Sequence, residues 1–312
     1  MSASHPHVVI AIPTFRRLER LGHLLGALPD QRFAAESLGV STAVVVIDND
    51  PAESARVVVA RAEASYSTEP ERGLSAVRNA AIAAAGDADA LVFIDDDELP
   101  EPGWLAELVR VWLSGAADFV SGRVVSVFGQ TLDPWIQAGG FFRRVEFSDG
   151  ERMPFAATNN LLIDLSFLRM HRLTFDPKFG MSGGEDIRLT SQAVAAGARI
   201  VAAPSAVVLD PVPPERTTRG WVLRRAFRVG STTVRCDVAL APTAFGRLIA
   251  RIRWFANGVG RIVVGGLRWV TGSIARSTVH RARGARLIAR GAGMCVGAFG
   301  VEYKEYRGRH AQ

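Results

Sequence analysis

A buried strand that ends in three consecutive carboxylates restricts the fold of this sequence more than any other feature. The apolar run 91–94 leads directly into Asp95, Asp96 and Asp97. Such a run is typical of a strand covered on both faces, and open α/β sheets bind ligands at the carboxyl ends of their strands. Adjacent like charges repel unless a cation lies between them, and carboxylate oxygens suit Mg²⁺ or Mn²⁺. Taken alone, the triplet is also compatible with a solvated turn.

Apolar strands alternate with helical patterns through the first half of the chain. Strands are expected at 8–12 and 43–47. Apolar residues recur at helical spacing in four segments, 18–28, 52–64, 74–85 and 104–113. Pro29 is expected to end the first helix. Because no hairpin signal separates the strands, the pattern favours an α/β fold with a mostly parallel, Rossmann-like sheet and helices on both faces.

Polar residues follow three of these strands. They are Thr14-Phe15-Arg16 (after Pro13), Asp48-Asn49-Asp50, and the acidic triplet. Parallel strands end at one edge of a sheet, so these groups are expected to converge on one crevice. The sequence contains no GxGxxG after the first strand and no GxxxxGK[ST]. We therefore expect phosphates to be held by a metal rather than by a glycine-rich loop.

A second acidic pair follows two glycines in the second half. Gly183 and Gly184 precede Glu185 and Asp186, and a helix is expected at 187–196. Glycine allows close backbone approach to a ligand. Acids are also favoured at helix N-termini by the dipole and the free N–H groups, so capping and catalysis both remain open for this pair.

Strands are also expected at 119–127 and 156–163, the latter with a polar entrance at Asn159 and Asn160. Trp135 lies in the loop-like segment 128–149, where it is a candidate either to stack on a sugar or to anchor the loop.

Positive charge is concentrated near the C-terminus. Residues 216–301 hold sixteen Arg, no Lys and a single acid, Asp237, for a charge of +15; the chain total of +6 leaves 6 − 15 = −9 for the rest. Arginine is interleaved with Leu, Ile, Val and Trp, and no stretch reaches the roughly 20 uncharged residues of a spanning helix. Basic amphipathic helices of this kind are typical of proteins that lie on the surface of an anionic membrane. Two alternatives remain open for this segment: a helical cap packed on the catalytic domain, and nucleic-acid binding.

The cysteine content fits a reducing compartment. Cys236 and Cys295 offer neither a disulfide framework nor a CxxC pair. The first residues lack a basic segment followed by a long apolar core, so no signal peptide is expected.

Five motifs in order carry a family resemblance. They are Ile12-Pro13-Thr14-Phe15-Arg16, Val46-Ile47-Asp48-Asn49, Gly73-Leu74-Ser75-Ala76-Val77-Arg78-Asn79, Phe93-Ile94-Asp95-Asp96-Asp97 and Gly183-Gly184-Glu185-Asp186. Together, over about residues 7–235, they make the chain resemble family 2 glycosyltransferases with the GT-A fold, of the bacterial exopolysaccharide, succinoglycan-type glucosyltransferase kind.

The resemblance implies roles for particular residues. Donor-binding residues would be Pro13, Thr14, Arg16, Asp48, Arg78, Asp95 and Asp96. Asp95 and Asp97 would be the outer acids of a DxD motif, facing the ribose and a Mn²⁺ or Mg²⁺ ion on the diphosphate. Asp186 would be the general base, with Glu185 beside it. The acceptor side would comprise Asn159, Asn160, Gly183, Gly184 and Trp135.

One position departs from the family pattern. The family usually places a His shortly before a Val-Pro-x-x-Arg segment, and here Asp210 stands where that His is expected. A carboxylate can still bind Mg²⁺ or Mn²⁺, so Asp210 is kept as a candidate third metal ligand beside Asp95 and Asp97.

We therefore expect a GT-A catalytic domain at 1–215, with a nucleotide-sugar half at about 1–127 and an acceptor half at about 128–215. Residues 216–312 would form a basic amphipathic helical tail that associates with an anionic membrane surface rather than with nucleic acid. The expected activity is inverting, metal-dependent transfer of a hexose from a UDP-sugar to a lipid-linked or growing saccharide in polysaccharide or cell-envelope biosynthesis. The expected place is the cytoplasm, peripheral on the inner face of the cytoplasmic membrane.

Two other classes compete with this prediction. A nucleotidyltransferase could share the acidic edge, but it needs a basic or glycine-rich triphosphate loop, and residues 13–16 make a poor one. A non-catalytic nucleic-acid-binding protein could use the arginine-rich tail, but it leaves the two acidic clusters unexplained.

Overall fold

The computed structural model describes residues 5–301, which divide into two compact units. The sheet unit comprises residues 5–125, 145–181 and 185–210. The helical unit comprises residues 126–144, 182–184 and 211–301. Each unit has its own core.

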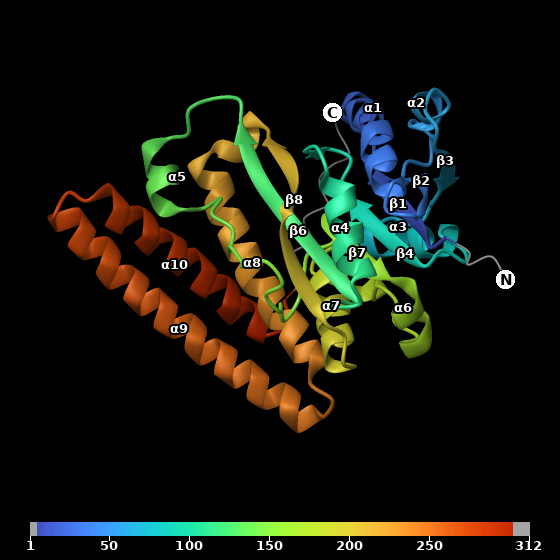
Figure 1. The fold of residues 1–312 in the computed structure, drawn as a ribbon. Coiled ribbons are helices and arrows are strands. Elements are labelled where there is room, and N and C mark those ends of the chain that lie inside the picture. The colour runs from blue at the N-terminus through green and yellow to red at the C-terminus, as the bar shows by residue number, and fades with distance from the viewer. Residues whose placement is uncertain (1–4, 302–312) are drawn as a thin grey trace. The chain divides into compact units, whose positions relative to one another are not determined.

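Among the described residues, eight strands form one sheet in the order β3-β2-β1-β4-β7-β6-β8-β5 (Figure 1). The strands are β1 (His7–Thr14), β2 (Ser41–Asp48), β3 (Ser65–Thr68), β4 (Ala90–Ile94), β5 (Leu99–Pro100), β6 (Phe119–Phe128), β7 (Asn160–Asp164) and β8 (Ile200–Val212). The strands β3, β2, β1 and β4 are parallel. The pairs β4–β7, β6–β7 and β5–β8 are antiparallel. The α/β fold is confirmed, with antiparallel strands extending its parallel half.

Helices cover both faces of this sheet, as expected. They are α1 (Leu18–Glu36), α2 (Arg56–Val59), α3 (Leu74–Ala84), α4 (Trp104–Leu113), α6 (Leu165–His171) and α7 (Glu185–Ala195), with a 3₁₀ turn η1 at Pro177–Phe179. Ile10 and Ile12 of β1 lie in a core with α1 and α4, whereas Val9 and Ala11 lie in a second core with α3, α6 and α7. This alternation follows from the two-residue period of a strand. In Figure 1, α1 lies above the sheet and α6 and α7 lie below it.

Several expected element boundaries are wrong. Pro29 does not end α1, which continues to Glu36 with Gln31 and Ala35 buried, so packing outweighs the lost backbone hydrogen bond. The helix expected at 52–64 shrinks to α2, and the strand β3 follows it. The strand expected from residue 156 begins at Asn160.

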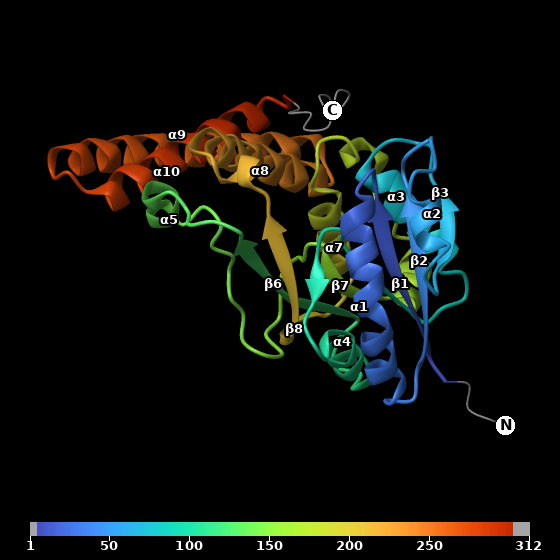
Figure 2. The same ribbon diagram turned by 90° about the horizontal axis from the view of Figure 1, so that it is seen from above.

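The helical unit contains α5 (Pro134–Gly139), a 3₁₀ turn η2 (Pro214–Thr217), and the long helices α8 (Arg219–Leu240), α9 (Ala244–Ile274) and α10 (Thr278–Ala298). Helix α10 lies between α8 and α9 (Figure 1), and Figure 2 shows the three as one layer seen edge-on. In the described part of the chain, none of the helices combines the length and the apolar character that crossing a membrane requires.

Candidate active site

The polar ends of the parallel strands meet at one edge, as the sequence predicts. Thr14 and Asp48 end β1 and β2 and are partners in the parallel register. The register of β1 with β4 pairs Ala11 with Phe93, so three residues further on Thr14 comes level with Asp96. There the Thr14 hydroxyl donates a hydrogen bond of 2.7 Å to the Asp96 carboxylate.

Two of the three consecutive aspartates are neutralised by arginines at the start of α1. Nη1 of Arg17 lies 2.7 Å from Asp96 and 2.8 Å from Asp97. Arg20, three residues later on the same helix, lies 3.4 Å from Asp97. Asp96 is 3% exposed, so its place is within the fold rather than on the crevice surface. Sequence reasoning missed Arg17 and Arg20, although their spacing of three puts them on one helix face above the acids.

Asp95 is the most open member of the triplet, and its side chain is 40% exposed. Nη2 of Arg78 lies 4.0 Å from Oδ1 of Asp95. The Asp95 amide donates to Glu98, which also accepts a 2.6 Å hydrogen bond from Asn159. Partial burial, followed by the charges of Asp97 and Asp96, raises the pKa of Asp95 to about 6 although Arg78 opposes the rise. Added positive charge would therefore stabilise the ionised form of Asp95.

Arg78 links this edge to the second acidic pair. It lies on α3 and forms a short ion pair with Glu185, the first residue of α7. Glu185 is 2% exposed, and burial raises its pKa to about 7 although Arg78 opposes the rise. Asp186 is half-buried, and its carboxylate accepts a 2.7 Å hydrogen bond from the Ile187 amide. Glu185 is thus enclosed and paired, and Asp186 is the more accessible acid of the two.

A close backbone approach fixes the start of α3 and with it Arg78. Gly73 has φ of 122°, and a Cβ there would lie 3.0 Å from the backbone of Gly180. The Leu74 amide donates to the Gly180 carbonyl, and the Ser75 hydroxyl donates to the Asp176 carbonyl. Only glycine fits this conformation without strain, which gives a physical reason for the glycine at the head of the third motif.

The carboxylate of Asp48 is engaged by the loop that follows β2. It is fully buried and accepts hydrogen bonds from the amides of Asp50 and Ala55 and from the Tyr66 hydroxyl. Asp50 in turn accepts two hydrogen bonds from Arg16, at 3.0 and 3.1 Å. This ion pair lowers the pKa of Asp50. Arg16 adopts φ of 55°, a left-handed conformation that is uncommon outside glycine and is enriched at functional sites. Asp50 belongs to the predicted polar segment 48–50, whereas Tyr66 had no distinguishing motif in the sequence.

The remaining predicted residues are not all brought to this edge. Asn160 is 1% exposed and bonds the Trp104 indole and the carbonyls of Arg123 and Ala206, so its amide is used within the fold. Asp210 is half-buried near the end of β8, and its charge contributes to the raised pKa of Glu98, behind burial and Asp95. Gly183, Gly184 and Trp135 belong to the helical unit. There Trp135 stacks on Phe141, with ring centroids 5.2 Å apart.

Within residues 5–301, the structure gathers no set of three or more His, Cys, Asp and Glu side chains into a ready-made metal cluster. The carboxylates at the sheet edge nevertheless have the donor chemistry that Mg²⁺ and Mn²⁺ prefer. Asp95 combines an open side chain with a raised pKa, so these residues fit a divalent cation that arrives with an anionic ligand.

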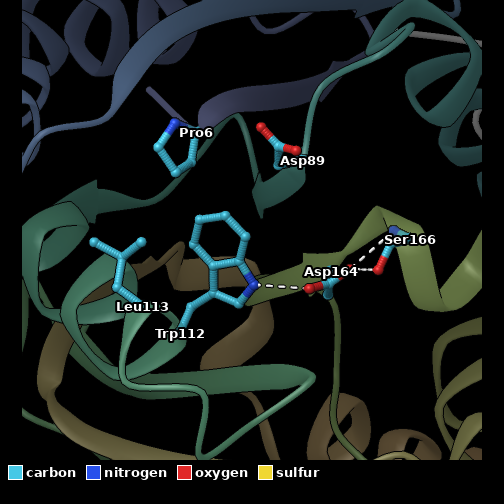
Figure 3. Close-up of a pocket in the computed structure, with 6 residues that line it drawn as sticks. All are labelled: Pro6, Asp89, Trp112, Leu113, Asp164 and Ser166. Carbon is cyan, nitrogen blue, oxygen red and sulfur yellow. Dashed lines mark hydrogen bonds between the residues drawn. The ribbon is translucent and has the colours of Figure 1, made fainter. Parts of the chain in front are cut away.

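A surface pocket of the sheet unit lies at the other ends of the parallel strands (Figure 3). Pro6 and Asp89 precede β1 and β4, and Trp112 and Asp164 meet there through a 3.0 Å hydrogen bond. Asp164 also caps α6 by accepting from the Ser166 amide. The polar groups of this pocket are thus used in helix capping and packing, and we assign no catalytic role to it.

This sheet order, with acids at the carboxyl edge, defines an α/β fold of the GT-A kind. The fold is similar to that of mannosyltransferase PcManGT from Pyrobaculum calidifontis in complex with GDP-Man and Mn²⁺ (TM-score 0.60, 16% identity, 92% of this chain and 86% of that chain). It is also similar to S. aureus TarS 1–349 in complex with UDP (TM-score 0.53, 16% identity, 95% of this chain and 93% of that chain). At these identities the likeness shows the fold alone.

The sequence comparisons show the family. The profile of Glycosyl transferase family 2 matches residues 9–171. The succinoglycan biosynthesis protein ExoM of Rhizobium meliloti is 30% identical over 232 residues, which are 72% of this chain and 74% of that protein. The chain belongs to glycosyl transferase family 2, and it is a glycosyltransferase.

Proposed function

We propose that this glycosyltransferase transfers a hexose, with inversion, from a nucleoside diphosphate sugar to a lipid-linked or growing saccharide. The observation that carries the proposal is the single edge formed by Thr14, the acidic triplet and Arg78. There the open carboxylate of Asp95 lies among groups that favour added positive charge. A divalent cation bound to the diphosphate of the donor would supply that positive charge, and the diphosphate would be the leaving group.

Asp95 and Asp97 would hold the divalent cation, with Asp210 as a candidate third ligand. When bound, such a cation would neutralise negative charge on the leaving diphosphate. When no donor is bound, Arg17 and Arg20 compensate the negative charge of Asp97. Thr14, Arg16, Asp48, Arg78 and Asp96 would shape the donor side, some of them by holding the loops that meet the nucleotide.

Asp186 is the proposed general base. It would accept the proton of the acceptor hydroxyl while that oxygen attacks the anomeric carbon and the bond to the diphosphate breaks. In-line attack at one face inverts the anomeric centre. Glu185 is buried against Arg78, which supports a positioning role for it rather than proton transfer.

UDP is the proposed nucleotide of the donor. One neighbour in fold was solved with UDP and another with GDP-Man, so both nucleotides belong in the test. The acceptor is proposed to be lipid-linked or a growing saccharide, because a 30% identical relative is named for succinoglycan biosynthesis. An enzyme that transfers sugars to such acceptors is proposed to lie peripherally at the inner face of the cytoplasmic membrane.

Calorimetry with UDP, GDP, ADP and CDP, each with Mn²⁺ and with EDTA, tests the donor site. We expect one diphosphate to bind selectively and only with the metal. The Asp97→Ala variant should lose this binding, because it removes a proposed ligand. Asp87→Ala is the matched control, since Asp87 is an exposed aspartate just before β4 and outside the site. Equal binding with EDTA, or unchanged binding by Asp97→Ala, would contradict the proposed metal site.

A further inference from the structure

Helix α9 carries a long apolar face that is left exposed. Its 31 residues extend about 46 Å at 1.5 Å per residue. Large apolar side chains recur along the whole helix with exposures between 53% and 80%, and the α9 apolar face is defined by Phe245, Leu248, Ile252, Val263, Leu267 and Ile274. A soluble monomer rarely exposes so long a continuous apolar stripe, which marks an interaction surface.

The opposite side of α9 is already occupied. Gly258, Gly265 and Gly272 recur every seven residues, and a Cβ at any of them would lie within 3.0 Å of an α10 atom. Leu267 and Ile274 come nine residues, or two and a half turns, after Gly258 and Gly265, and so point away from α10. The exposed face is therefore held in a fixed orientation by the helix packing behind it.

The charge around this face has one sign. Helix α9 contains five Arg and α10 four, and neither contains an acid. Arg253 pairs at 2.7 Å with Asp237, the only acid in residues 216–301. Arg251 and Arg253, both exposed, come immediately before and after Ile252, so the helical rotation places them on either side of the α9 apolar face. An apolar stripe flanked by arginines is complementary to the interface of an anionic bilayer.

Other occupants fit this surface less well. A second copy of the chain would bring two α9 helices together with their arginines and without acids to pair them. Nucleic acid would satisfy the arginines but leave the apolar side chains in water. A lipid interface satisfies both parts of the surface at once.

We propose that the α9 apolar face docks in the headgroup region of an anionic phospholipid bilayer, with α9 lying in the plane of the membrane and its arginines contacting lipid phosphates. The purpose of this docking rests on the proposed lipid-linked acceptor. The docking itself needs neither donor nor metal, so its success or failure is measured separately from transfer.

Flotation of the full chain with vesicles tests the surface. One vesicle preparation is phosphatidylcholine alone, and the other holds equal parts of phosphatidylcholine and phosphatidylglycerol. We expect the protein to float with the anionic vesicles, less so as salt is raised, and not with phosphatidylcholine alone. Nucleotide binding, measured on the same preparation, is expected to be independent of the vesicles.

The triple variant Ile252→Ser/Val263→Ser/Leu267→Ser removes apolar area from the surface only. We expect its partition into anionic vesicles to fall at least about tenfold, since several exposed aliphatic groups no longer leave water. A second variant, Phe245→Ser/Ile274→Ser, probes the two ends of the helix. The matched control, Phe33→Ser/Met170→Ser, removes equally exposed apolar groups from the sheet unit and should float like the parent.

Three results would overturn the proposal. The parent protein could fail to float, or both α9 variants could float as well as the parent. Sedimentation could instead show a dimer that the α9 variants dissociate, which would assign the face to a second copy of the chain.

Discussion

Arg78 contacts two carboxylates that come from different parts of the chain. It forms a buried ion pair with Glu185 and lies 4.0 Å from Asp95. The second oxygen of Glu185, Oε2, is buried without a hydrogen-bond partner among the described residues. A buried carboxylate with an unpaired oxygen is costly to ionise even beside an arginine, which explains the raised pKa of Glu185.

This raised pKa predicts how stability changes with pH. The pKa of Glu185 rises from 4.5 to about 7 on folding, so the folded state holds the proton more tightly than the unfolded state. The stabilising contribution of the protonated group is complete below about pH 4.5 and is lost as the pH rises through 7. We expect the free energy of unfolding of Glu185→Gln to exceed that of the parent by less than about 1 kcal/mol at pH 5 and by up to about 3 kcal/mol at pH 8.

Urea unfolding in EDTA at both pH values measures this difference. Glu107→Gln is the control, because the hydrogen bond from Arg110 lowers the pKa of Glu107 and the group stays ionised throughout the window. Its effect should be the same at pH 5 and pH 8. If the free energies of unfolding of Glu185→Gln and the parent differed by the same amount at both pH values, the Glu185 carboxylate would be ionised without cost.

Helices α9 and α10 approach each other through glycines. A Cβ at Gly265 would lie 2.8 Å from the Gly284 carbonyl, and one at Gly291 would lie 2.6 Å from the Gly258 carbonyl. Helix α8 packs on α10 in the same way at Gly230 and Gly293. Glycine is a poor helix former, so its recurrence at these points is explained by close backbone packing rather than by propensity.

Two neighbouring glycines on α9 allow this explanation to be tested. We expect Gly265→Ala to lower the free energy of unfolding by about 1–3 kcal/mol, because the new methyl group overlaps α10. Gly266→Ala meets nothing within 4 Å and should raise stability by up to about 1 kcal/mol through helix propensity. Thermal unfolding followed by far-ultraviolet circular dichroism compares the two. If both substitutions changed the free energy of unfolding in the same direction, α9 and α10 would not pack this closely.

At the scale of the whole molecule, the two units are interleaved along the chain. Residues 126–144 and 182–184 belong to the helical unit although they lie between segments of the sheet unit. In the helical unit, Arg286 donates hydrogen bonds to the carbonyls of Gly139 and Gly140 at the end of α5, and its guanidinium lies over Phe141. The loop after β6 is therefore held by a helix that comes much later in the chain, since 146 residues separate Arg286 from Gly140.

This interleaving makes a prediction about truncation. A chain that stops at residue 215 keeps α5 and its aromatic residues but loses α8 and α10, which cover them. We expect the truncated protein to expose this apolar surface, to bind a hydrophobic dye and to self-associate, in contrast to the full chain. Dye fluorescence and sedimentation measure the outcome. A monomeric, dye-negative fragment with full nucleotide affinity would show instead that 1–215 is a self-sufficient domain.

The sequence by itself was enough for the fold class, the acidic edge and the basic helices. Strand and helix periods, and the rule that parallel strands end at one edge, bring Thr14 and the acidic triplet together without further information. These are local signals, carried by residues close to one another in the chain. The limits of the elements were less predictable, because α1 passes through Pro29 and α2 is cut short by packing that no local pattern encodes.

Only the tertiary structure decided which charged groups meet. Arg17 neutralises Asp96 and Asp97, which lie 79 or more residues further along the chain, and Arg78 pairs with Glu185 across 107 residues. Asn160 forms hydrogen bonds with Trp104 and with two strand carbonyls. A motif identifies residues by their type and their spacing along the chain. The free-energy cost of burying a charge depends instead on its neighbours in space. For this reason the sequence alone located the acidic edge, and only the fold separated the open carboxylate of Asp95 from the enclosed ones of Asp96 and Glu185.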